Sequence, residues 1–166
     1  MRAGGIVGGI AQYGSIVEKC YNIGDIEGTS SIGGIAGSHG RSSKIENSYN
    51  IGNVKGETGV GGITGKSYGS AGSITNSYNI GKVQGSTEIG GIIGGNPNSL
   101  IITNAYYLTG TADKDQGNVG GTELAKDKEY ISTTFLTTSN ESENIWKVDE
   151  NKNNGYPILV ELEPSN

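Results

Sequence analysis

A pentapeptide recurs along the chain at a nearly constant interval. Gly-Gly-Ile-x-Gly begins at Gly4, Gly33, Gly61 and Gly90, and a degenerate copy begins at Gly120. Successive copies are 29, 28, 29 and 30 residues apart. A fixed period of this length indicates a repeat fold, in which each unit buries its apolar face against its neighbours.

Two further blocks share this period. In its clearest copy, residues 45–52, one block reads Ile-Glu-Asn-Ser-Tyr-Asn-Ile-Gly, and we place its other copies at Ile16, Ile74 and Ile102. These copies contain Tyr21, Tyr49, Tyr78 and Tyr106. The other block is Val54-Lys55-Gly56, which recurs at Ile26 and Val83.

Residues 45–52 alternate in the way that a β-strand does. Ile45, Asn47, Tyr49 and Ile51 fall on one face of the predicted strand. Two other repeat folds are excluded. Leucine-rich repeats have similar periods but need leucine at fixed offsets, and propeller blades are longer and need four strands each. We therefore predict an all-β fold, a right-handed parallel β-helix of about four coils over residues 1–121, with the handedness taken from the general preference of parallel crossovers.

A β-helix needs less apolar surface than a globular core does. Neighbouring coils pair about 4.8 Å apart, so equivalent side chains stack on one another. This suits a chain with 30 glycines and a hydrophobic fraction of 33%. The predicted apolar ladders are Ile6, Ile35, Ile63 and Ile92, and Ile23, Ile51, Ile80 and Leu108. Asn47, Asn76 and Asn104 share the inward phase, so we expect them to form a ladder of bonded amides.

The repeat stops near residue 122, and residues 122–166 are predicted to be a C-terminal capping segment. Thr122 is placed to cap a short helix over residues 123–130, and two strand-like runs follow at 145–148 and 157–160. The only Phe and the only Trp, Phe135 and Trp146, lie here, and we expect them to cover the last coil. Further coils or another cap are expected before Gly4.

The charge and cysteine content exclude several classes of function. The formal net charge is −5 and the isoelectric point is near 4.9, which argues against nucleic-acid binding. Apolar runs stay well short of 18 residues, so we expect no membrane insertion of this segment. A single cysteine, Cys20, cannot form an internal disulfide.

The coils offer little for catalysis, and we expect no enzyme activity, cofactor or metal. His39 is the only histidine, and we expect it in an exposed loop. Asp25 is the only aspartate before residue 111, whereas solenoid enzymes that act on acidic polysaccharides cluster their carboxylates. Residues 113–118 and 149–155 resemble calcium loops but lack the required glycine and glutamate spacing. The alternative to a non-catalytic chain is a fragment of a solenoid enzyme that degrades polysaccharide.

The tyrosines are the candidates for binding. Those in the repeated block share the phase of Ile45 and are expected in the core. Three others fall outside that phase and are our candidates for contact with a ligand at the surface: Tyr13, Tyr68 and Tyr107.

Val/Ile-Gly-Gly-Ile-x-Gly followed by Asn-Ser-Tyr-Asn-Ile-Gly-x-Val-x-Gly resembles the GLUG-motif repeat of bacterial surface proteins. The resemblance covers residues 4 to 121, and the tail around 146–148 and 154–159 looks like the segment that often closes such arrays. The repeat occurs in adhesins and in IgA-specific metallopeptidases. The resemblance implies a solenoid in a secreted, cell-surface or wall-associated protein, where it serves as a spacer between other domains or as an adhesive module for host glycan or protein. It does not imply peptidase activity, because no match to the zinc motif is present.

Overall fold

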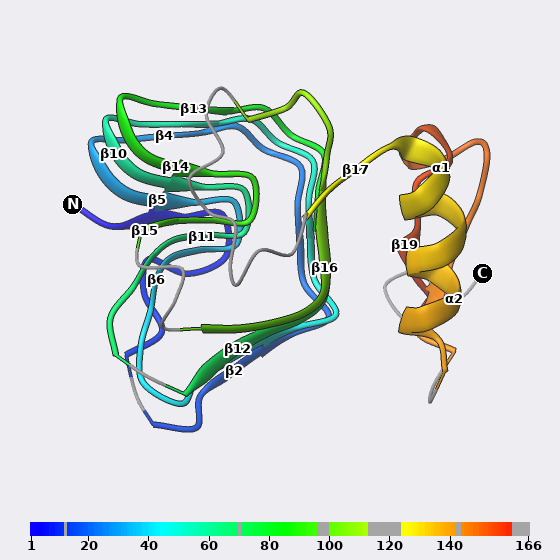
Figure 1. Ribbon diagram of the computed structural model, residues 1–166, viewed down its shortest axis with the longest axis horizontal. Helices are drawn as coiled ribbons and strands as arrows, with labels where there is room; N and C mark the ends of the chain where they lie inside the picture. Colours follow the sequence, from blue (N-terminus) through cyan, green and yellow to red (C-terminus); the bar gives the residue numbers. More distant parts are fainter. Residues whose placement is uncertain (12, 70, 96–99, 113–123, 142–143, 161–166) are drawn as a thin grey trace.

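The computed structural model describes residues 1–11, 13–69, 71–95, 100–112, 124–141 and 144–160. They form a parallel β-solenoid of about four turns, whose coils overlie one another in Figure 1, followed by a small C-terminal segment. The strands of successive coils pair in parallel in all four sheets of the solenoid. The predicted all-β parallel solenoid is confirmed.

Each coil contributes strands to the same sheets. The first sheet contains β1(Ala3–Gly4), β5(Ser30–Gly33), β10(Thr58–Gly61) and β14(Thr87–Gly90). The second contains β6(Ala36–His39), β11(Thr64–Ser67) and β15(Ile93–Gly95). The third contains β2(Ile16–Glu18), β3(Tyr21–Asn22), β7(Lys44–Glu46), β8(Tyr49–Asn50), β12(Gly72–Asn79), β16(Leu100–Leu108) and β17(Ala125–Lys126). The fourth contains β4(Ile26–Glu27), β9(Val54–Lys55) and β13(Val83–Gln84).

The register stacks like residues on like, with one correction to the repeat. Ile45 pairs with Ile74 on one side and with Val17 on the other. The block in the first coil is therefore in register from Val17, and Ile16, which pairs with Lys44, is 54% exposed. The predicted ladder of Ile35, Ile63 and Ile92 is buried in the core, whereas Ile6 in the first coil is exposed.

The alternation of faces reverses at Asn47, which the sequence pattern does not reveal. Asn47 has φ +48, and the matching Lys19, Asn76 and Asn104 are also left-handed. Ile45 points into the coil, but beyond this bend Tyr49 packs in the cluster formed with the C-terminal segment, with Ile51 against it. The predicted ladder of Ile23, Ile51, Ile80 and Leu108 is therefore wrong as an inner ladder, because three members contact this cluster and Ile23 is exposed.

The same reversal moves the amide ladder by three residues. Asn22 Nδ2 donates to Asn50 Oδ1 at 2.8 Å, and Asn50 Nδ2 donates to Asn79 Oδ1 at 2.7 Å. Among the asparagines predicted for this role, Asn104 donates to Asn76 at 2.8 Å, whereas buried Asn47 Oδ1 has no hydrogen-bond partner among the described residues. The continuous internal ladder is thus formed by Asn22, Asn50 and Asn79. A strict alternation of faces along the strand predicts that these residues point outwards.

The pentapeptide glycines are required by close approach of other groups. A Cβ on Gly33 would lie 2.1 Å from the Ala36 carbonyl oxygen, and one on Gly34 would lie 2.3 Å from the Asn50 side chain. A Cβ on Gly37 would lie 2.6 Å from the Gly8 carbonyl oxygen. A side chain at any of these three positions would displace backbone or the amide ladder. The glycines of the pentapeptide are therefore required by the close packing of neighbouring strands and coils.

The C-terminal segment begins with β17, which pairs with β16. It continues through α1(Lys128–Tyr130), the π-helix η2(Ile131–Phe135), α2(Leu136–Ser139), β18(Trp146–Lys147), the 3₁₀ turn η3(Asn153–Gly155) and β19(Ile158–Leu159). The two predicted strands form an antiparallel pair. The helix begins later than predicted, at an N-cap on Asp127, whose carboxylate accepts from Tyr130 N at 2.8 Å. Thr122 and Glu123 lie outside the described residues.

This segment lies beside the coils, against the outer face of the third sheet (Figure 1). The Tyr78 ring lies 5.5 Å from Phe135 and 5.8 Å from Trp146, and Tyr49 lies 5.8 Å from Trp146, centroid to centroid. Phe135 and Trp146 therefore cover tyrosines on the side of the coils. The expectation that they cover the last coil is wrong. Of the helices in the described ranges, none is long and apolar enough to cross a membrane.

Candidate ligand-binding groove

Two of the three surface candidates meet in one groove. Tyr13 follows Ile10, whose N donates to Ser38 O at 2.9 Å, and Tyr68 follows β11, with its N donating to His39 O at 2.7 Å. These bonds tie both loops to β6. The groove has a volume of about 240 Å³, and its described lining consists of Arg2, Ile10, Ala11, Tyr13, Ser38, Gly40, Arg41 and Tyr68.

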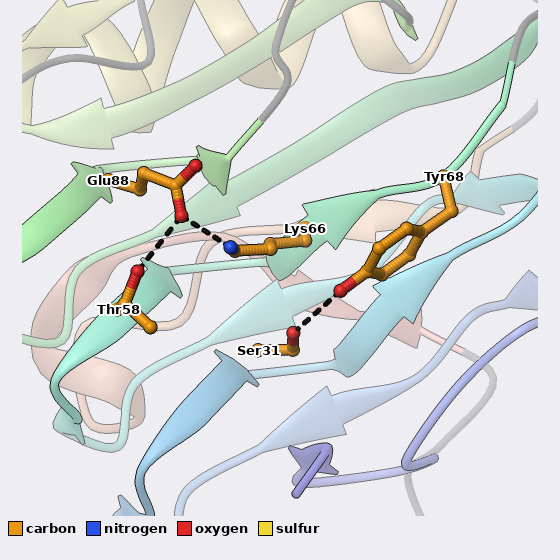
Figure 2. A network of polar contacts seen from close by, with 5 residues as sticks. All are labelled: Ser31, Thr58, Lys66, Tyr68 and Glu88. Carbon is orange, nitrogen blue, oxygen red and sulfur yellow. Dashed lines mark hydrogen bonds and ion pairs between the residues drawn. The ribbon is translucent and has the colours of Figure 1, made fainter.

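The two tyrosines are presented differently. Tyr13 is 72% exposed, whereas Tyr68 is 44% exposed and anchored at its tip. The Tyr68 hydroxyl is hydrogen-bonded to Ser31 Oγ (Figure 2), with 3.1 Å between the two oxygens. The Arg2 guanidinium carbon lies 4.8 Å from the ring centroid. Tyr68 is thus held at its hydroxyl by Ser31 and on one face by Arg2, which reduces the conformational entropy that a ligand would have to remove.

The third candidate, Tyr107, is wrong as a surface residue. It is 5% exposed and packs in the inner core, because it pairs with Asn79 and takes the place of the amide ladder in the next coil. The tyrosines of the repeated block do not form an open platform either, since Tyr49 and Tyr78 are buried. Tyr13 and Tyr68 remain the candidates.

A polar network lies beside the anchored ring (Figure 2). Lys66 forms an ion pair with Glu88, and Thr58 Oγ1 donates to the same carboxylate at 2.9 Å. The hydrogen bonds from Lys66 and Thr58 lower the pKa of Glu88. Because Glu88 neutralises Lys66, this lysine adds little net charge to the neighbourhood of the groove.

Both arginine side chains run over glycines. A Cβ on Gly9 would lie 3.7 Å from Arg2 Cδ, and one on Gly69 would lie 2.3 Å from Arg41 Cγ. Gly69 also has φ +123, which disfavours any side chain there. The backbone around the groove therefore leaves room for the two guanidinium groups.

His39 contradicts the sequence expectation of an exposed loop residue. It ends β6, is fully buried, and its Nε2 lies 2.7 Å from Ser43 O. Burial lowers its pKa, against the opposing effect of the Ser43 bond. Asp25 accepts a 2.7 Å bond from Asn53 N. No group of three metal-ligating side chains occurs within the described ranges.

One known crystal structure resembles this chain over most of its length. No protein-family model and no curated protein matches the chain. A crystal structure described as a putative immunoglobulin A1 protease from Bacteroides ovatus superimposes with a TM-score of 0.71 at 23% sequence identity. The match covers 95% of this chain and 62% of that one, so the chain spans less than two thirds of its neighbour. Coverage this high must include most of the C-terminal segment, so that protein shares the fold of coils and segment together.

Sequence reasoning missed the arginines. Arg2 and Arg41 are the only arginines in the chain, and they lie 39 positions apart with no shared motif. Their scarcity was the available signal, but only the stacking of coils places them in one groove.

Proposed function

We propose that the chain is a non-catalytic module of a bacterial cell-surface protein, which contacts host glycan or protein through the groove and otherwise separates neighbouring domains. The convergence of Tyr13 and Tyr68 on one groove carries this proposal. Exposed tyrosines on a rigid scaffold offer apolar area with a polar tip at low entropic cost. The extracellular setting is supported by the repeat resemblance and by the name of the structural neighbour.

The non-catalytic part of the proposal is supported by how the few reactive side chains are engaged. His39 is buried against Ser43, and Asp25 holds the next coil through Asn53 N. An incubation with pectin, hyaluronan, xylan and peptidoglycan should release no product. A reproducible rate that one carboxylate substitution abolishes would favour the alternative, a solenoid enzyme acting on polysaccharide.

The binding part is tested with arrays of host glycans and extracellular-matrix proteins. Labelled wild type is compared with Tyr13→Ala and with Tyr21→Ala, the latter removing a ring that is 41% exposed on the third sheet. We expect signals that Tyr13→Ala abolishes and Tyr21→Ala retains. Signals that survive Tyr13→Ala and Tyr68→Ala together would place any binding elsewhere.

A further inference from the structure

The two arginines bear on which ligand the groove selects, and this inference rests on the function proposed above. The chain has a formal net charge of −5 and two arginines, and both arginines line one groove. Its described lining contains no carboxylate. Neither guanidinium forms an ion pair within the described ranges, where the cations that do so are lysines.

Two guanidinium groups with no counterion among the described residues make the groove a site for an anion. Arginine offers a planar fork of N–H donors that matches a carboxylate or a sulfate, which a lysine ammonium does not. Arg2 also lies over the Tyr68 ring, and this contact holds its charge at the groove. An anionic group is therefore the feature that the site recognises best.

The remaining lining fits a sugar ring, and β6 offers no free edge to an extended peptide. Tyrosine faces are flat and apolar and can lie against the C–H face of a pyranose, while hydroxyl groups remain in water. A peptide that binds by strand addition needs a free strand edge. Here β6 is occupied on both sides, by β11 and by bridges to Val7 and Ile10.

The size of the groove limits the ligand further. A volume of about 240 Å³ lies below the roughly 300–1,000 Å³ of typical sites for drug-sized molecules. We propose that the groove binds one terminal acidic sugar, with Arg2 and Arg41 on its carboxylate or sulfate and the tyrosine rings on its carbon face. The neutral remainder of the glycan would extend into solvent.

Isothermal titration calorimetry on the whole chain tests this with three probes: 6′-sialyllactose, 3′-sulfated lactose and lactose. At least one acidic probe should bind ten times or more tightly than lactose, and the two acidic arms distinguish carboxylate from sulfate. Arg2→Gln and Arg41→Gln should each weaken that binding at least tenfold, and Arg41→Lys should restore only part of it. Lys82→Gln removes one exposed charge far along the repeat from the groove and should have no effect.

The other outcomes separate this inference from the function on which it rests. Equal binding of lactose and the acidic probes would overturn the acidic selection and leave a sugar-binding groove. Binding of a sulfated or acidic peptide, with no response to any sugar, would overturn the sugar class and leave a binding module. Acidic-sugar binding that is unchanged in both arginine variants would overturn the groove as the site. No binding by any probe would overturn the inference, while array signals that depend on Tyr13 would still support the function.

Discussion

The Tyr78 hydroxyl donates a 2.5 Å hydrogen bond to the carbonyl oxygen of Pro157, 79 residues further along the chain. Asn153 Nδ2 donates to the same hydroxyl at 2.8 Å. The ring stacks on Tyr49 at 5.1 Å and is fully buried. Tyr78 thus joins the third coil to the C-terminal segment through both its ring and its hydroxyl.

Removing this one hydroxyl should destabilise the fold. Tyr78→Phe removes the hydroxyl's bonds to the Pro157 oxygen and the Asn153 amide, which keep only a 3.5 Å hydrogen bond to each other. We expect a cost of about 1–3 kcal/mol, and Tyr78→Ala should cost about 3–5 kcal/mol. Tyr21→Phe is the matched control, because Tyr21 lies at the exposed end of the same ring stack. Chemical denaturation measures all three, and equal stability of Tyr78→Phe and wild type would contradict the link between coil and segment.

The stability should fall in alkaline solution. Burial raises the pKa of Tyr49 to about 12 and that of Tyr78 well above 10. An unfolded tyrosine releases its proton near pH 10 while the folded ones keep theirs, so the unfolded state binds fewer protons above that pH. The stability that the protonated, buried tyrosines contribute is therefore fully present below pH 10 and is lost as the pH rises towards 12. Melting curves between pH 8 and 11.5 should show this decline, with a smaller slope for Tyr49→Phe; a flat profile would mean that the ring stack is open to water.

A hydrogen bond of the buried amide ladder should contribute more to the free energy of unfolding than an exposed asparagine bond between coils. Asn50→Ala breaks three hydrogen bonds at once, those to Asn22, to Asn79 and to the Gly52 carbonyl oxygen, which should cost on the order of 3 kcal/mol. Asn53 also bridges two coils, accepting from Lys82 N at 3.1 Å, but at the surface. Asn53→Ala should therefore cost about 1 kcal/mol or less. Equal free energies of unfolding for the two variants would contradict an internal ladder.

Gly59 should be required because of Lys66 rather than because of its backbone alone. The matching positions in the adjacent coils, Ser31 and Glu88, carry side chains at φ +56 and +53. At Gly59 a Cβ would lie 2.4 Å from the Lys66 side chain. A double-mutant cycle of Gly59→Ala and Lys66→Ala should give a coupling of at least about 0.5 kcal/mol, with the glycine substitution less harmful once the lysine is shortened. Additive losses would show that the left-handed backbone alone requires glycine.

The sequence predicts the solenoid because its period and its stacked isoleucines express the fold directly. It predicts the phase of residues beyond Asn47 wrongly, because one left-handed residue exchanges inside and outside. Asparagine adopts that conformation more readily than most residues but is also common elsewhere, so the alternation pattern alone does not reveal the bend. His39 is misplaced because the adjacent Gly40 and Arg41 are typical of a loop, although the strand continues to His39. The groove is predicted in part: Tyr13 and Tyr68 are out of phase with the core, but their meeting with two arginines depends on stacking between coils.

Chemical labelling of tyrosines, read by mass spectrometry, tests most directly whether the groove is the binding site of this scaffold. In the free protein, nitration should be fast at Tyr13, intermediate at Tyr68 and Tyr21, which are 44% and 41% exposed, and slow at Tyr49, Tyr78 and Tyr107. With saturating 6′-sialyllactose, or with the glycan found on the array, Tyr13 and Tyr68 should become protected while Tyr21 reacts as before. Protection of Tyr21 instead, or unchanged labelling of Tyr13 and Tyr68 under a glycan that binds, would contradict the assignment of the groove.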